Sequence, residues 1–183
     1  HPMNRRFLLT AAALLLAGCT TLTGPVGTRR FSGRFSLRAA GAENVQTAAG
    51  KYRLTATGDV YELVILSPLN GVLGKVTVTP SEARVERGGH PDLTAPTETQ
   101  LMQSTFGFDL PIAVFTAWLD GIPSPKIPFT RTAADSFTQS GWSVTYTASP
   151  AGGRPAVLKL GRADALQRLN LTMTVEKETV SAA

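Results

Sequence analysis

Few side chains in this sequence have the type and spacing that catalysis requires. His90, the only histidine after His1, lies in the glycine-rich segment RGGHP at residues 87–91, where exposure is expected. One histidine without a pair of cysteines does not make a zinc site. Residues 71–75 (GVLGK) have the glycines and lysine of a phosphate-binding loop, but Val76 replaces the hydroxyl residue that such a loop needs. We therefore expect no enzyme, no metal site and no cofactor.

The thiol of Cys19 is the one side chain with a predicted chemical role. Residues 4–6 (NRR) supply a basic start, and residues 7–17 form an apolar run too short to span a bilayer, which is typical of a secretory signal. Residues 16–19 (LAGC) resemble the lipobox of bacterial lipoproteins, in which small residues admit the signal peptidase and the cysteine thiol is acylated. We therefore expect a signal peptide at residues 1–18 and lipid on Cys19. An ordinary signal peptide with a chance cysteine is the alternative.

The residue after Cys19 indicates where the chain is anchored. By resemblance to the bacterial lipoprotein pathway, Thr20 is not the aspartate that commonly retains lipoproteins at the inner membrane. This implies an outer-membrane, lipid-anchored protein that faces the periplasm, held firmly because the pathway attaches two or three acyl chains. Residues 19–30 then form the lipidated cysteine and a tether, and residues 31–183 form a single domain.

The charge of the chain argues against a nucleic-acid partner. Without the signal, which contains Arg5 and Arg6, the chain has 16 basic and 13 acidic side chains and no dense basic stripe. Arg29 and Arg30 either lie near anionic headgroups or are simply solvated. We expect a monomer that binds no nucleic acid.

Most of the domain has the period-two pattern of strands. Short turns such as Gly58-Asp59 and Ser140-Gly141 separate the runs, and connections this short imply antiparallel neighbours. The sequence therefore predicts a mainly β (α+β) domain whose antiparallel sheet curls into a barrel or half barrel. The predicted strands are residues 31–39, 51–57, 60–66, 73–79, 82–87, 136–140, 142–148, 156–160 and 166–176.

Residues 96–121 have the period of helices instead. Leu101, Met102 and Phe106 fall on one stripe before Gly107, and Asp109 is placed to cap a second helix. That second helix carries a stripe of Ile112, Phe115, Trp118 and Leu119, with Asp120 near its end. Since each stripe must be buried, we expect a helical hairpin on one face or mouth of the curved sheet.

Several short segments, taken in their order along the chain, resemble the outer-membrane lipoprotein receptor family called LolB. They are residues 31–34 (FSGR), 61–63 (YEL), 66–69 (LSPL), 110–111 (LP), 118–123 (WLDGIP), 139–142 (QSGW) with Tyr146, and 155–160 (PAVLKL). The resemblance implies a curved antiparallel sheet forming an incomplete barrel, with a helical lid and an apolar cavity. It also implies partners: a periplasmic lipoprotein carrier (LolA-like), client lipoproteins held by their acyl chains, and outer-membrane phospholipid.

The resemblance gives a role to a leucine in the turn at residues 67–73 (SPLNGVL). The family carries an exposed leucine in a turn after a proline, which is used at the membrane, and Leu69 matches that position. Val72 and Leu73 could share the membrane contact. A leucine folded back over Val72 and Leu73 is the alternative.

The candidate acyl-chain-binding residues are apolar side chains of the predicted strands and helices. We expect about half of them to be ordinary core residues, because period two does not say which face of a sheet borders a cavity. The candidates are Phe35, Leu37, Tyr52, Leu54, Leu63, Ile65, Phe106, Phe115, Trp118, Trp142 and Tyr146.

Two other functions fit the same features. A non-catalytic envelope-assembly lipoprotein would have the same anchor with a filled sheet interior, and a small-lipid-binding barrel would take free fatty acid. The primary hypothesis is a receptor that accepts lipoproteins from the carrier and inserts them into the outer membrane.

Overall fold

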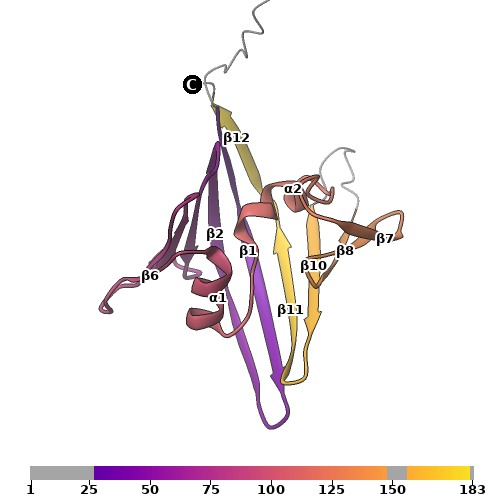
Figure 1. The fold of residues 1–183 in the computed structure, drawn as a ribbon, viewed down its shortest axis with the longest axis horizontal. Coiled ribbons are helices and arrows are strands. Elements are labelled where there is room, and N and C mark those ends of the chain that lie inside the picture. Colours follow the sequence, from indigo (N-terminus) through magenta and orange to yellow (C-terminus); the bar gives the residue numbers. More distant parts are fainter. Residues whose placement is uncertain (1–26, 148–155, 182–183) are drawn as a thin grey trace, which may run out of the picture.

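The computed structural model describes residues 27–147 and 156–181. The predicted signal peptide, Cys19 and most of the tether lie outside the described residues. The described part is mostly antiparallel strand with two short α-helices, which confirms the expected fold class (Figure 1). None of its helices is long and apolar enough to cross a membrane.

The strands follow one another along the chain in two groups separated by the helices. The first group is β1 (Thr28–Gly41), β2 (Val45–Thr57), β3 (Val60–Leu66), β4 (Val72–Val78), β5 (Ala83–Glu86) and β6 (Leu93–Ala95). The second group is β7 (Phe129–Ala133), β8 (Ser136–Gln139), β9 (Trp142–Thr147), β10 (Val157–Ala163), β11 (Gln167–Thr174) and β12 (Lys177–Ser181).

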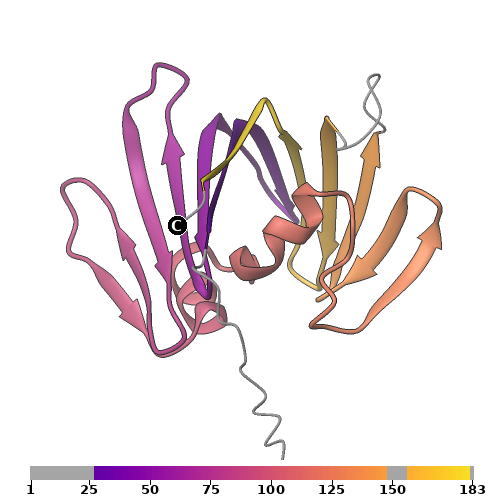
Figure 2. The ribbon, with the colours of Figure 1, turned by 90° about the horizontal axis from the view of Figure 1, so that it is seen from above.

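All these strands form one sheet that does not close. Its order is β6-β5-β4-β3-β2-β1-β11-β10-β9-β8-β7, with β12 also paired to β1, so β6 and β7 are free edges. Seen from above, the sheet is bent into a U, and the helices lie in its opening (Figure 2). The incomplete barrel that the resemblance implied is therefore confirmed.

The long strand β1 joins the two halves of the sheet. It pairs with β2 along one side, and along the other side it pairs first with β12 and then with β11. The partner of β1 changes from β12 to β11 between Ser32 and Phe35, and a Cβ on the intervening Gly33 would collide with the carbonyl oxygen of Thr174. Glycine is needed at this position because only it allows the backbones to approach so closely.

The sequence missed three strands, and each lacks a buried face. Every residue of β7 is exposed, β6 has three residues, and β12 is a largely exposed strand. Period two appears only where one face is buried, so these strands carry no such signal. The long strands also extend further than predicted, and β1 begins at Thr28, inside the range assigned to the tether.

The helical cover is made of α1 (Glu98–Phe106), the 3-10 turn η1 (Ile112–Val114) and α2 (Phe115–Leu119). The side chain of Thr97 caps α1, and Gly107 ends it at φ 76°, as a C-terminal glycine does. The expected capping role of Asp109 is wrong. The second helix begins as η1 after Pro111 without a side-chain cap, because Leu110-Pro111 holds the chain extended after Asp109.

Candidate functional site

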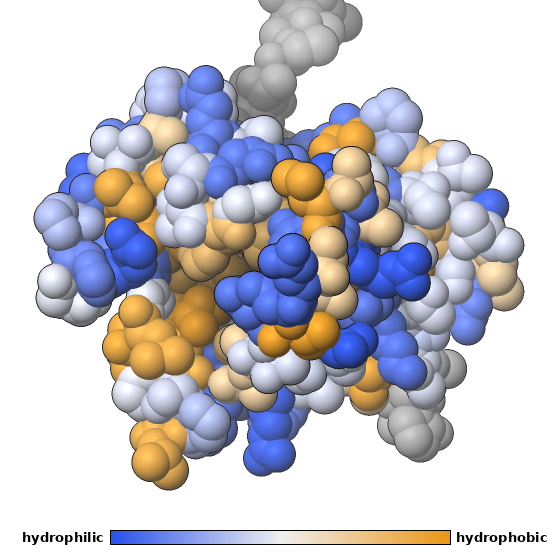
Figure 3. Space-filling model, turned by 90° about the horizontal axis from the view of Figure 1, so that it is seen from below, coloured by the Kyte–Doolittle hydropathy of each residue, from blue (hydrophilic) through white to orange (hydrophobic). Residues whose placement is uncertain are grey.

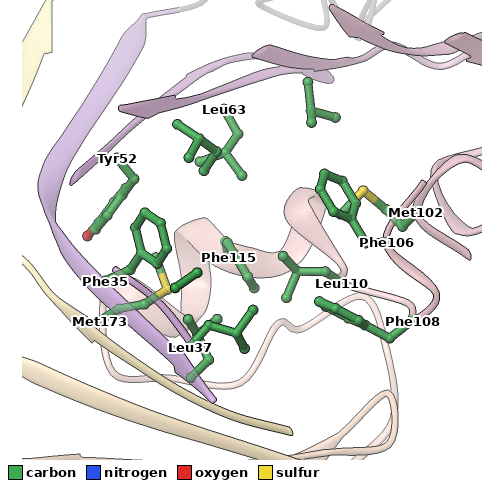
Figure 4. A pocket seen from close by; sticks show the side chains of 14 residues that line it. Phe35, Leu37, Tyr52, Leu63, Met102, Phe106, Phe108, Leu110, Phe115 and Met173 are labelled. Carbon is green, nitrogen blue, oxygen red and sulfur yellow. The ribbon is translucent and has the colours of Figure 1, made fainter. Parts of the chain in front are cut away.

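An apolar cavity of about 260 Å³ lies between the concave face of the sheet and the helical cover. Figure 4 shows side chains from both layers pointing into it. The sheet contributes Phe35, Leu37, Ala48, Tyr52, Leu63, Ile65, Val76, Leu171 and Met173, and the cover contributes Met102, Phe106, Phe108, Leu110 and Phe115. A space with this lining can hold a hydrocarbon group and offers nothing to an ionic one.

The only polar side-chain atom in this lining is already bonded. The hydroxyl of Tyr52 donates a hydrogen bond to the carbonyl oxygen of Thr174 at 2.8 Å. This bond satisfies the hydroxyl at the sheet, so the ring borders the cavity as a purely apolar surface.

The cavity is open at one end of the molecule. Phe106, at the end of α1, is 44% exposed, and its ring lies 6.3 Å from that of Phe108 (centroid to centroid). Figure 3, which views the molecule from below, shows a hollow with apolar walls and further apolar side chains beside it. The exposed phenylalanine is therefore at the rim, where a ligand would enter.

Seven of the predicted acyl-chain-binding residues line this cavity: Phe35, Leu37, Tyr52, Leu63, Ile65, Phe106 and Phe115. The other four do not. Leu54 is fully buried in the core, on the same face of the sheet as the cavity. The ring of Tyr146 packs 6.4 Å from that of Phe137, and its hydroxyl lies near Arg131.

The two tryptophans were expected at the cavity, and this expectation is wrong. Each is buried and uses its indole nitrogen to attach the cover to the β8–β9 side of the sheet. Trp118 donates to Oε1 of Gln139 at 2.8 Å, and Trp142 donates to the carbonyl oxygen of Asp109 at 3.0 Å. A buried indole needs such a partner, and neither tryptophan is part of the cavity lining.

The other half of the lining consists of residues that were not predicted at the cavity. Leu171 and Met173 alternate with less buried residues on β11, and Val76 does so on β4, so periodicity marked them as buried without placing them at the cavity. Met102 was assigned to a helical stripe. Phe108 and Leu110 lie in the connection between the helices, where no periodic signal exists, and Ala48 lies on an exposed part of β2.

The cover contains two carboxyl groups with unusual surroundings. Burial raises the pKa of the Glu98 carboxyl to about 7, although its Oε1 accepts a hydrogen bond of 3.2 Å from the backbone nitrogen of Ala113. Burial likewise raises the pKa of Asp109, whose Oδ1 is buried without a hydrogen-bond partner. The hydrogen bond from Ala113 favours the ionised carboxylate, but the burial of Glu98 outweighs it, so this carboxyl group keeps its proton to a higher pH than a free one does.

An ion-pair cluster attaches the other end of the cover to the sheet. Arg29 on β1 donates two hydrogen bonds to Asp120, at 2.9 and 2.8 Å, and two to Oε1 of Glu178 on β12, at 3.3 and 2.7 Å. Asp120 is the residue that ends α2, so this cluster fixes α2 against β1 and β12. Arg29 is consequently not the solvated residue that the sequence allowed.

The turn that carries Leu69 is ordered by its own hydrogen bonds. Asn70 adopts φ 68°, and the backbone nitrogens of Asn70 and Ser67 donate to the carbonyl oxygens of Ser67 and Gly71. This is a three-residue hairpin loop in which asparagine takes the left-handed position. Leu69 is 92% exposed at its tip, so it is not folded back over Val72 and Leu73, which are also exposed.

Nothing in the described part of the chain gathers ligands for a metal. No group of three or more histidine, cysteine or acidic side chains forms there, and His90 is exposed in the loop between β5 and β6.

Comparison with known proteins points to one family. The family described as outer membrane lipoprotein LolB matches residues 28–176. The outer-membrane lipoprotein LolB of Cupriavidus pinatubonensis is 33% identical over 163 residues, which cover 80% of this chain and 79% of that protein. The protein of the same description from Cupriavidus metallidurans is 32% identical over 154 residues, covering 77% and 76%. That of Cupriavidus taiwanensis is 28% identical over 202 residues, covering 97% and 100%.

Proposed function

Because the chain belongs to the LolB family of outer-membrane lipoproteins, we propose that it is the receptor that takes lipoproteins from a periplasmic carrier and inserts them into the outer membrane. It acts without catalysing a chemical reaction, and the client is held by its acyl chains. Its own anchor is lipid on Cys19, which lies outside the described residues.

The apolar cavity is the observation that carries this proposal. An acyl chain of about sixteen carbons costs more than about 10 kcal/mol to expose to water, at about 0.8 kcal/mol for each methylene. A receptor therefore has to offer the chain a continuous apolar surface, and the lining supplies one from both sheet and cover. An envelope-assembly protein with a filled interior would not need this open space.

The cover has to move for an acyl chain to enter. The cavity of about 260 Å³ is smaller than the roughly 300 to 1,000 Å³ of ordinary ligand sites. α2 is held by Trp118 and Arg29, whereas the last turn of α1 presents the exposed Phe106. We infer that the C-terminal end of α1 and the connection through Phe108 swing outwards when the chain enters.

Leu69 is the proposed contact with the outer membrane, with Val72 and Leu73 beside it. The ordered loop holds the side chain of Leu69 in water at 92% exposure. Moving it fully into lipid would lower its free energy by about 1.5 to 3 kcal/mol. The contact would bring the receptor to the bilayer surface while the acyl chains leave the cavity.

The test measures two transfer steps with a soluble Cys19→Ser form of the full chain. A carrier loaded with a lipoprotein is mixed with the receptor, and the loaded receptor is then mixed with liposomes. Acceptance followed by delivery is the expected result. A receptor that binds a fluorescent fatty acid but accepts no lipoprotein would instead be a small-lipid-binding barrel, and one that binds neither would contradict the proposal.

A further inference from the structure

The outer, convex face of the central strands is rich in basic side chains. Opposite residues of paired strands share a face, and Phe31, Tyr52, Leu169 and Leu158 face the core, so their sequence neighbours face outwards. The outward-facing basic residues of β1, β2, β10, β11 and β12 are Arg30, Arg34, Arg38, Lys51, Arg53, Lys159, Arg168 and Lys177.

Three of these side chains surround a depression of about 370 Å³ on that face. We call it the basic depression, and its charged and amide side chains are Arg34, Lys51, Arg53, Asn70 and Glu176. The ammonium of Lys51 donates a hydrogen bond to Oδ1 of Asn70 at 2.9 Å. Asn70 follows Leu69, so the basic depression directly adjoins the loop that exposes the leucine.

The charges in the basic depression are not balanced by the protein. Arg34 and Lys51 stand directly opposite each other on β1 and β2, an arrangement of like charges that destabilises a sheet. Glu176 lies 3.1 Å from Nε of Arg34, and it is the only carboxylate in the lining. Arg53 forms no ion pair with the described residues. The site is therefore complementary to an anion.

We propose that the basic depression binds the phosphate groups of anionic phospholipids while Leu69 enters the same membrane surface. This deepens the proposed function and rests on its membrane contact at Leu69. An apolar side chain flanked by basic ones is the arrangement that binds a lipid interface, since the apolar part enters the acyl region and the basic part meets the headgroups.

The fold gives this contact a direction. In Figure 2 the tip of the β3–β4 hairpin lies at the upper edge, on the side of the sheet away from the helices. The basic depression is on that same outer side, so the two contacts lie on one surface. A receptor bound through both keeps its helical cover off the bilayer and accessible from the periplasm.

The test compares binding of the soluble Cys19→Ser full chain to phosphatidylcholine vesicles with and without phosphatidylglycerol. Anionic lipid should strengthen binding. The double variant Lys51→Gln/Arg53→Gln should reduce that gain by about 25-fold, at roughly five-fold for each charge. Arg84→Gln/Lys126→Gln removes two charges outside the basic depression and should retain the gain. Raising the salt from about 0.15 M to about 1 M should also abolish it, because charges are then screened beyond about 3 Å.

Several outcomes would overturn the inference separately from the proposed function. Equal binding to both kinds of vesicle, with delivery still dependent on Leu69, would leave the proposed function intact and remove the headgroup site. A loss of carrier binding in Lys51→Gln/Arg53→Gln, with vesicle binding unchanged, would assign the basic depression to an acidic protein. Arg53→Gln alone leaves the Lys51–Asn70 bond in place, and its circular dichroism and vesicle binding show whether the loss reflects charge or a disturbed loop.

Discussion

The indole nitrogen of Trp118 donates a hydrogen bond of 2.8 Å to the side-chain oxygen of Gln139. That amide also accepts from the backbone nitrogen of Ser124 and donates to the carbonyl oxygens of Ser124 and Ile127. One buried glutamine thus joins α2, the segment that follows it and β8. Trp118 is consequently part of the attachment of the cover and not part of the ligand surface.

We predict that Trp118→Phe and Gln139→Ala lower stability and leave acyl binding nearly unchanged in the folded protein. Each leaves buried polar groups without a partner, at a cost of about 1 to 3 kcal/mol. Thermal unfolding measures the stability, and titration with a fluorescent fatty acid measures binding. A large loss of affinity with unchanged melting temperature would return Trp118 to the cavity.

Replacing Phe106 should weaken acyl binding and leave stability nearly unchanged. Phe106→Ala removes a half-exposed ring from the rim of the cavity. Such a ring should contribute about half the free energy of a fully buried phenylalanine, so we expect acyl affinity to fall roughly three- to ten-fold. Stability should change by less than about 1 kcal/mol. The matched control is Phe129→Ala, because Phe129 is 47% exposed on β7 and does not line the cavity. Equal affinities for the two variants would show that the ligand enters elsewhere.

Glu98 should make stability depend on pH. Its pKa is about 7 in the folded chain, above the ordinary 4.5, so the folded state binds the proton more tightly than the unfolded state does. This stabilisation is fully present below about pH 4.5 and is lost as the pH rises through about 7. The stabilisation amounts to about 2 kcal/mol when the partial exposure of the Glu98 carboxyl is taken into account.

The variant Glu98→Gln keeps an acceptor for the nitrogen of Ala113 and cannot ionise. Chemical denaturation between about pH 4.5 and 8 should therefore show a smaller loss of stability in this variant than in the wild type. Some slope should remain, since the pKa of Asp109 is raised in the same direction. Glu43→Gln, at the exposed turn after β1, is the control and should retain the wild-type slope. An unchanged slope in Glu98→Gln would rule out Glu98 as the source.

Leu69→Glu should separate acceptance from delivery. The side chain is a loop tip outside the core, so folding and transfer from carrier to receptor should remain nearly normal. Transfer from receptor to liposomes should fail, because glutamate must lose its hydration or take up a proton to enter the acyl region. Leu166→Glu is the matched control, since Leu166 is 83% exposed at another hairpin turn, between β10 and β11. Normal delivery by Leu69→Glu would contradict the membrane contact.

Local patterns in the sequence were sufficient for the class of fold and for much of its layout. Period two marked the half-buried strands, and Gly107 and the Gly58-Asp59 turn marked ends that the structure has. These features depend on neighbours within a few residues, so they can be predicted without knowledge of the tertiary structure. The exposed position of Leu69 could be predicted in the same way, because a proline and an asparagine mark a short turn there.

Only the tertiary structure decided which buried residues border open space. Leu54 and Leu63 are directly opposite on β2 and β3, yet one is fully buried in the core and the other lines the cavity. The difference depends on where the cover packs against the sheet and where it leaves space. The positions of Trp118, Trp142 and Arg29, which attach the cover, decide this. Those anchors join residues 21 to 91 positions apart in the chain, and no periodic pattern records a contact at that separation.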